Sequence, residues 1–160
     1  MKRFLQCSLV LAHCLTTLTI IAAPEYRLTR EFWSSPAFVR SFMGDYGFRT
    51  EVEPKVSRSE QQVLREVVTK AQTDLDEAII HLAGKVKADS SAALDFALAT
   101  MQFQSGRLGR AALGYEKAIE KFPNFLRAHK NLGFVLIQQD DFDDAAEHLA
   151  KALSLGEGDG

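Results

Sequence analysis

The chain has 160 residues, of which 19 are basic and 21 are acidic, and its formal net charge is −2. A chain of this length can bury enough apolar surface to fold as one domain without disulfide bonds. The slightly acidic balance argues against nucleic acid as a partner, because nucleic-acid-binding domains carry an excess of lysine and arginine.

Residues 1–23 have the composition of a secretory signal peptide. Lys2 and Arg3 form a positive start, an uncharged stretch follows (with histidine taken as neutral), and small residues close it at Ala23. This pattern predicts cleavage near Ala23 and an exported protein, either periplasmic or secreted. The alternative is a retained membrane anchor over residues 4–23, although several polar side chains make this stretch less hydrophobic than a typical spanning helix.

Both cysteines, Cys7 and Cys14, lie in this leader. Once the leader is removed, the chain has no thiol nucleophile and can form no disulfide. Loss of Lys2 and Arg3 leaves 17 basic and 21 acidic residues, a formal net charge of −4. The processed chain is therefore even less suited to nucleic acid.

Residues 24–57 form a segment rich in aromatic side chains. Its seven rings belong to Tyr26, Phe32, Trp33, Phe38, Phe42, Tyr46 and Phe48. So aromatic a segment is not typical of a solvated linker. We expect the rings to pack on the first helices that follow and to cap them, and the alternative is a docking segment for a partner.

Two local structures are predicted within this aromatic segment. Pro36 and Gly44 are typical of the start and the end of a short helix. Phe48, Thr50 and Val52 alternate with charged residues, which predicts an extended arm or an edge strand.

Residues 58–91 are predicted to form two helices. Ser57 and Glu60 have the S-x-x-E spacing of a capping box at the start of the first. Its apolar stripe consists of Val63, Leu64, Val67, Val68 and Ala71. The stripe of the second consists of Leu75, Ala78 and Leu82.

The sequence then repeats with a period of 34 residues, in two units that span residues 92–125 and 126–159. Large residues align with large ones and small with small. The aligned positions are Leu98 with Leu132, Ala99 with Gly133, Ala111 with Ala145, Tyr115 with Leu149, and Ala118 with Ala152, and Pro123 closes the first unit. A fixed period of this length indicates a repeat array, in which each unit buries its apolar face against its neighbours.

These positions resemble the tetratricopeptide repeat. That family has a large residue followed by a small one in its first helix. Its second helix has a small residue, then an aromatic or leucine four positions later, then alanine. The resemblance implies an all-α fold of antiparallel helix pairs stacked into an α-solenoid, here preceded by the aromatic arm and a leader helix. Residues 58–91 would be a further repeat, because their second stripe lies 33 residues before the matching positions of the next unit. This repeat would be degenerate and terminal, because Arg65 and Glu66 stand near the places of the large and the small residue.

Local signals at the turns agree with the repeat. Gly106 and Asp140 occupy the turn between the two helices of each unit. Glycine adopts a positive φ readily and aspartate less so, and we expect both residues to be left-handed. Ser91 and Asp141 are predicted to cap the helices that follow them.

The array ends abruptly in a glycine-rich sequence after Leu155. No capping helix is recognisable, and a bare last helix would expose apolar residues such as Leu153. We favour the interpretation that the 160 residues are the front part of a longer protein.

The resemblance also implies a concave groove lined by the first helix of each unit. The positions concerned are Phe96, Thr100, Phe103, Gln104, Arg127, Lys130, Asn131, Phe134 and Ile137. Phe96 and Thr100 stand where repeats that clamp a terminal carboxylate have lysine and asparagine, so that mode is disfavoured. We expect a mixed apolar and basic groove, with Arg127 and Lys130 both exposed, that accepts an amphipathic or extended segment with acidic flanks. For each of the three phenylalanines, a position in the inter-repeat core is the alternative.

Candidate chemistry is sparse. His81, His129 and His148 include no pair at the i,i+4 spacing of a helical metal site, and we expect them to be ordinary surface or groove-edge histidines. The acidic cluster from Asp140 to Glu147 lacks the order of a calcium-binding loop. We therefore expect no catalytic residue, no metal and no cofactor.

The sequence favours an exported module for protein–protein interaction, whose partner is a protein or a peptide. Contact with a membrane is expected only through an uncleaved leader. Two alternatives stay open. One is a membrane-anchored assembly factor, and the other is a structural N-terminal region of a longer repeat protein whose binding site lies beyond Gly160.

Overall fold

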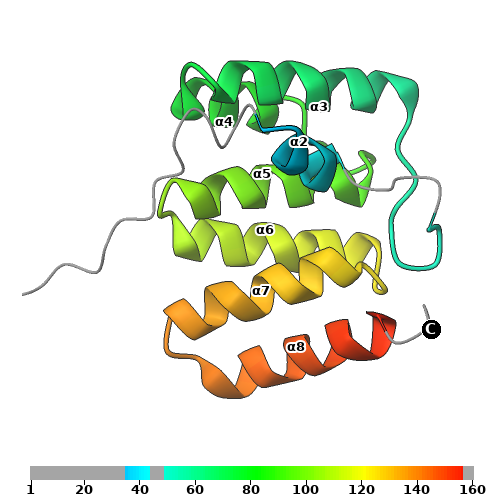
Figure 1. The fold of residues 1–160 in the computed structure, drawn as a ribbon, viewed down its shortest axis with the longest axis vertical. Helices are drawn as coiled ribbons and strands as arrows, with labels where there is room; N and C mark the ends of the chain where they lie inside the picture. The colour runs from blue at the N-terminus through cyan, green and yellow to red at the C-terminus, as the bar shows by residue number, and fades with distance from the viewer. Residues whose placement is uncertain (1–34, 44–48, 157–160) are drawn as a thin grey trace, which may run out of the picture.

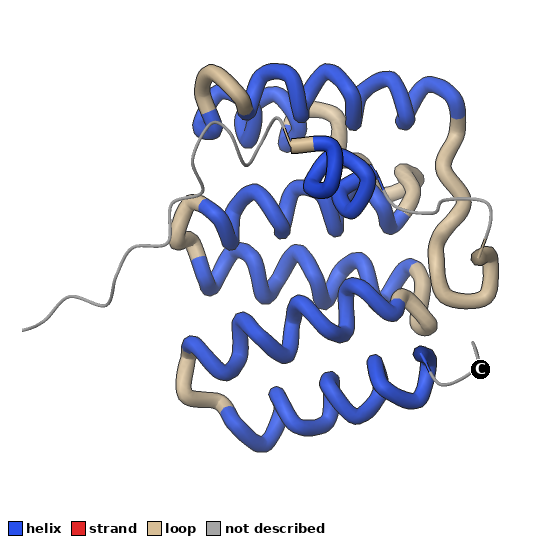
Figure 2. The backbone as a smooth tube through the Cα atoms, in the orientation of Figure 1, coloured by secondary structure: helices blue, strands red, loops and turns tan. Residues whose placement is uncertain are grey.

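The computed structural model describes residues 35–43 and 49–156, and every regular element in these two ranges is an α-helix (Figures 1 and 2). The helices in chain order are α2 (Pro36–Met43), α3 (Arg58–Ala71), α4 (Leu75–Ala83), α5 (Ala92–Gln104), α6 (Leu108–Lys121), α7 (Leu126–Gln138) and α8 (Phe142–Gly156). The leader and the aromatic residues before Ser35 and at 44–48 lie outside the described ranges.

Helices α3 to α8 stack in sequence order as antiparallel pairs (Figure 1). Within the pairs, α3 packs on α4, α5 on α6 and α7 on α8, and the contacts of α4 with α5 and of α6 with α7 join successive pairs. This arrangement confirms the predicted α-solenoid of helix pairs.

The boundaries of α3 and α4 follow from side-chain caps. The Glu60 N–H donates to Ser57 Oγ at 3.2 Å, and the Ser57 N–H donates to Glu60 Oε2 at 2.9 Å, so the predicted capping box is present. The Asp74 carboxylate accepts the Glu77 N–H at the start of α4. These bonds satisfy N–H groups that have no partner within a helix.

The predicted side-chain cap at Ser91 is wrong. Ser91 directly precedes α5, but its hydroxyl makes no cap hydrogen bond. The Leu94 N–H donates instead to the Ser91 carbonyl at 3.0 Å. The Ser91 N–H donates to Glu60 Oε1 at 2.7 Å, so the residue joins the start of α5 to the start of α3.

The turns within the last two pairs have the same backbone geometry. Gly106 has a φ of 74° and Asp140 a φ of 62°, as predicted. The Arg107 N–H donates to the Gln102 carbonyl and the Asp141 N–H to the Leu136 carbonyl, five residues back in both cases. These bonds are those of a left-handed helix terminus, so two different residues close the same turn.

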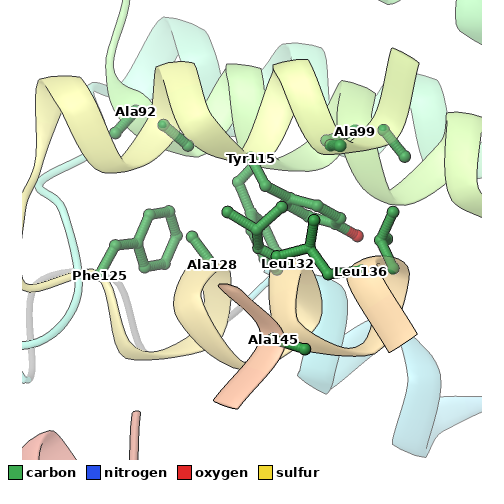
Figure 3. Packing of buried hydrophobic residues seen from close by; sticks show 13 residues of the cluster. Ala92, Ala99, Tyr115, Phe125, Ala128, Leu132, Leu136 and Ala145 are labelled. Atoms are coloured by element: carbon green, nitrogen blue, oxygen red, sulfur yellow. The ribbon is translucent and has the colours of Figure 1, made fainter. Parts of the chain in front are cut away.

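Small residues at the repeat positions allow the helices to approach closely. A Cβ added at Gly114 of α6 would lie 2.8 Å from the Ala99 Cβ, and one added at Gly133 of α7 would lie 2.6 Å from the Leu149 Cγ. Figure 3 shows the large side chains of Tyr115, Phe125 and Leu132 among small residues such as Ala99, Ala128 and Ala145 in the same core cluster. The repeat positions that are buried are Ala99, Ala111, Tyr115, Ala118, Leu132, Gly133, Ala145 and Ala152. Leu98 and Leu149 are half-buried and Pro123 is exposed.

The predicted short helix is α2, and it covers the start of the array. Phe42 is only 3% exposed and belongs to a core cluster built mainly by α3, α4 and α5, with Val39 packed against the same cluster. The described part of the aromatic segment therefore packs on the first helices of the array. The side chain of Phe38 and the other five rings lie outside the described residues.

Residues 49–53 do not form the predicted extended arm or edge strand. The N–H groups of Val52 and Glu53 both donate to the Arg49 carbonyl, so the chain turns here. No strand occurs within residues 35–43 and 49–156 for an edge strand to join. Val52 and Glu53 are both buried, which the alternation of exposed and buried residues in a strand would not allow.

Candidate partner-binding groove

Helices α5 and α7 are the first helices of the last two pairs, and a chain of polar side chains links them through α6. The Asn131 amide donates to the Tyr115 hydroxyl at 3.3 Å, and that hydroxyl donates to Thr100 Oγ1 at 3.1 Å. The Thr100 hydroxyl in turn donates to the Phe96 carbonyl one turn earlier in α5. Tyr115 thus connects two of the predicted groove residues, Thr100 on α5 and Asn131 on α7.

Tyr115 is fully buried although its hydroxyl reaches this polar chain. Burial raises the pKa of Tyr115 to about 12, while the hydrogen bonds to Thr100 and Asn131 oppose that rise. The phenol therefore stays neutral and donates a hydrogen bond at any physiological pH. Its role is to fix Thr100 and Asn131 relative to each other.

The exposed residues of the predicted groove lie on one face of α7. Phe134 is 48% exposed and Ile137 is 41% exposed, and Lys130 lies one turn before Phe134 on the same face. Asn131 is half-buried beside them. On α5, the predicted residues Thr100, Phe103 and Gln104 are half-buried.

Phe96 belongs to the core and does not line an open groove. It is 3% exposed, and its ring centroid lies 4.9 Å from that of Phe125 and 5.6 Å from that of Tyr115. Of the two alternatives for this residue, the inter-repeat core is therefore correct. Phe125 is the connecting residue just before α7, and it fills the space against Phe96 that a groove ligand would need.

The expectation that Arg127 is exposed and carries an unneutralised charge is wrong. Its Nε and Nη2 donate to Glu53 Oε1 and Oε2 at 2.6 and 2.7 Å, and both side chains are largely buried. The guanidinium also lies over the rings of Phe96 and Phe125, 4.8 and 5.6 Å from their centroids. Glu53 lies 74 residues upstream, so no local pattern around Arg127 predicts the pair.

The same upstream segment caps α7. The Leu126 N–H donates to the Val52 carbonyl at 3.2 Å, and Phe125 supplies no side-chain cap. Val52 and Glu53 therefore bind the first turn of α7 through a backbone bond and a bidentate ion pair. We call this contact, made by Val52 and Glu53 with Leu126 and Arg127, the α7 clasp.

The histidines are arranged differently from the expectation. His129 of α7 is buried, and its Nδ1 lies 3.0 Å from Nδ1 of His148 in α8, so the prediction of a surface position is wrong for His129. The two residues are 19 positions apart, and only the antiparallel packing of α7 on α8 brings them together. His81 is half-buried in α4, with Nε2 at 3.8 Å from Glu66 Oε2.

Within residues 35–43 and 49–156, no group of three or more histidine, cysteine, aspartate or glutamate side chains could hold a metal ion. In the same residues, none of the helices combines the length and the hydropathy needed to cross a bilayer.

Residues 102–159, from the last turn of α5 to just beyond α8, match the family model described as tetratricopeptide repeat. No curated protein sequence matches the chain. The matched region contains α6, α7 and α8, with the turns at Gly106 and Asp140 and most of the repeat positions. The match covers 58 of the 160 residues, and together with the fold it supports tetratricopeptide repeats in this part of the chain. Proteins with such repeats generally serve as non-enzymatic modules for protein–protein interaction.

Proposed function

We propose that the chain is an exported interaction module that binds a segment of a partner protein on the solvent-exposed groove face of α7 and the adjoining face of α5. The observation that carries this proposal is the pair Phe134 and Ile137. Both are exposed apolar residues on one face of a helix whose opposite face is packed in the core. Exposed apolar residues that lie together on one face are typical of a binding surface.

The neighbouring polar groups define the chemistry of the partner. Lys130 offers one exposed cation next to Phe134, and Asn131 is held in place by its bond to Tyr115. With Arg127 engaged by Glu53, only Lys130 of the two predicted cations is open to a partner. The preferred segment therefore carries two apolar side chains for Phe134 and Ile137 and a single acidic residue for Lys130.

A peptide-display selection on the folded protein, followed by calorimetry with the selected peptide, tests this surface. Replacement of Phe134 and Ile137 by alanine removes the apolar contacts and should weaken binding by at least tenfold, since each lost contact of this size is worth ~1–2 kcal/mol. Both side chains are exposed, so the thermal melting of the variant should change little.

The matched control is Leu113→Ala in α6. Leu113 is exposed to a similar extent, at 59%, but lies on a second helix of a pair rather than on the face of α7. Loss of binding in the Leu113 variant, or unchanged binding in the Phe134 and Ile137 variant, would show that the partner does not bind the groove face of α7. Lys130→Glu should weaken binding mainly at low salt.

Export is the second part of the proposal, and it rests on the composition of residues 1–23. N-terminal sequencing of the protein recovered from the exported fraction should begin after Ala23 or close to it. Recovery of residues 1–23 on a protein in the membrane fraction would favour the membrane-anchored assembly factor instead.

A further inference from the structure

The contact between α7 and α8 contains two histidines that no part of the proposed function uses. His129 Nδ1 lies 3.0 Å from His148 Nδ1, and the ring centroids are 5.2 Å apart. The other ring nitrogen of His129, Nε2, lies 2.9 Å from the carbonyl oxygen of Pro123, in the connection between α6 and α7. The pair thus joins the last helix to α7, and through Pro123 to the end of the preceding unit.

The hydrogen bonds determine where the protons are. A carbonyl oxygen can only accept, so Nε2 of His129 carries a hydrogen and donates to Pro123. In neutral His129 the Nδ1 atom is then an acceptor. His148 must therefore donate its Nδ1–H to His129 Nδ1, because two acceptors at 3.0 Å would repel.

The pair accommodates one additional proton but not two. A proton added to Nε2 of His148 leaves the Nδ1–H of that ring in place and strengthens its bond to His129. A second proton has only Nδ1 of His129 to occupy, where it faces the Nδ1–H of His148. Two donors and two positive charges then meet at a distance of 3.0 Å, and the rings must separate.

We propose that the His129–His148 pair is a proton-operated latch between α7 and α8, which holds the last helix in place while the pair carries at most one additional proton and releases it when both rings are charged. The helix that is released is α8 rather than α7, because His148 is half-buried, whereas His129 is also held by its hydrogen bond to Pro123. The other contacts that α8 makes with α7 use small residues such as Ala145 and Gly133, together with the half-buried Leu149.

The surroundings of His129 favour its neutral form overall. Burial is the main cause that lowers the pKa of His129, while the hydrogen bond to the Pro123 carbonyl raises it. From α8, the charges of His148 and Lys151 lower the pKa and the carboxylate of Glu147 raises it. These are the charged groups that act on His129 from the helix packed against it.

The sign of the pH dependence follows from this lowered pKa. An unfolded or detached histidine binds a proton below a pH of about 6.5. At that pH the packed His129 stays neutral, so the released state binds more protons than the packed state. The stability of the α7–α8 contact is therefore complete above about pH 6.5 and falls as the pH drops toward the lowered pKa of the packed ring.

Hydrogen exchange of the full chain at several pH values, with each rate corrected for its intrinsic pH dependence, tests the latch. The amides of α8 should lose protection between about pH 7 and pH 5, by up to tenfold for each pH unit below the pKa of the free ring. The amides of α4, at the other end of the array, should lose less over the same range. His148→Gln keeps a donor opposite His129 Nδ1 and removes one of the two charges, while His129 stays buried. The pH-dependent loss of α8 protection should therefore become smaller than in the wild-type chain without disappearing.

His81→Gln is the matched control, since His81 lies in α4 away from the pair. In this variant the α8 amides should lose protection with pH as they do in the wild-type chain. The latch is refuted if α8 and α4 lose protection in parallel in the wild-type chain, or if His148→Gln retains the wild-type loss. Proton NMR of the wild-type rings gives an independent test that needs no variant. His129 should titrate below the range of a free histidine, because burial lowers its pKa, and titration of His129 near pH 6.5 would overturn the proposal.

Discussion

The two ends of the helix array differ in how far their apolar side chains are exposed to solvent. At the first end, α2 lies over the array and Phe42 is 3% exposed among the residues of α3, α4 and α5. At the last end, Phe142 and Leu153 of α8 are 60% and 68% exposed. Leu153 has the exposure predicted for it on a last helix with no repeat packed against it, and the continuation of the chain beyond Gly160 stays a prediction. Figure 1 shows α2 in front of α3 and α5, so its apolar side chain is covered by these helices, whereas the apolar side chains of Phe142 and Leu153 face solvent.

The α7 clasp adds a second difference. In most repeat proteins each unit contacts only its neighbours, so stability is close to a sum of neighbouring terms. Here Val52 and Glu53, just before α3, bind the first turn of α7 and bypass α4, α5 and α6. We therefore expect the first end and the α7 region to unfold together, while among the described helices α8 packs mainly on α7.

The largest expected effect contrasts the two ends directly. Phe42→Ala empties a buried site and should lower the free energy of unfolding by ~3–5 kcal/mol. Leu153→Ala removes an exposed side chain and should change it by no more than ~0.5 kcal/mol. Urea denaturation followed by circular dichroism measures both. Similar losses for the two variants would mean that Leu153 is covered in solution and that the ends do not differ.

The α7 clasp can be broken from one side. Arg127→Ala leaves the buried Glu53 carboxylate without its cation, which should cost ~3–5 kcal/mol. The double variant with Glu53→Ala removes the stranded charge as well and should recover part of that loss. Urea denaturation of the two single variants and the double variant gives the coupling energy between the side chains. A coupling energy near zero would show that the clasp does not hold the first end to α7.

The smallest expected effect concerns the close approach of α5 and α6, far from either end. Alanine normally stabilises a helix by about 1 kcal/mol relative to glycine. At Gly114 the added methyl group would meet Ala99, so Gly114→Ala should instead destabilise by ~1–3 kcal/mol.

Gly109→Ala, in the same helix and with open space around it, is the control and should stabilise the protein. Thermal melting of both variants is sufficient. A rise in melting temperature for Gly114→Ala would mean that the two helices are less tightly packed than the alanine and glycine positions indicate.

Most predictions that rested on neighbouring residues were accurate, although the side-chain cap predicted at Ser91 was wrong. The capping box at Ser57 and Glu60 and the left-handed turns at Gly106 and Asp140 depend on side chains and backbone within a few residues. The 34-residue period placed Ala111 and Tyr115 in helix contacts, because buried faces recur with the repeat. The one local prediction of a strand, around Thr50 and Val52, failed because burial against α7 outweighs an alternating pattern when the described part of the chain offers no partner strand.

The candidate groove could be assigned to the first helices of the pairs, but not residue by residue. Phe134 and Ile137 are exposed as a groove requires, whereas Phe96 is closed off by Phe125 and Arg127. Nothing in the sequence of α5 distinguishes a phenylalanine in the core from one in the groove. Whether a phenylalanine of α5 is buried or exposed depends on which residues from elsewhere in the chain pack against it.

The sequence by itself determined the helices, their turns, the repeat period and the small residues at the helix contacts, because these depend on interactions within one turn or one unit. Only the tertiary structure decided that Glu53 pairs with Arg127 and that His129 meets His148. Those pairs join side chains 74 and 19 positions apart, which meet only once the helices have stacked. Burial then makes each pair matter, since a charge or a ring nitrogen taken out of water needs a partner wherever in the chain that partner lies.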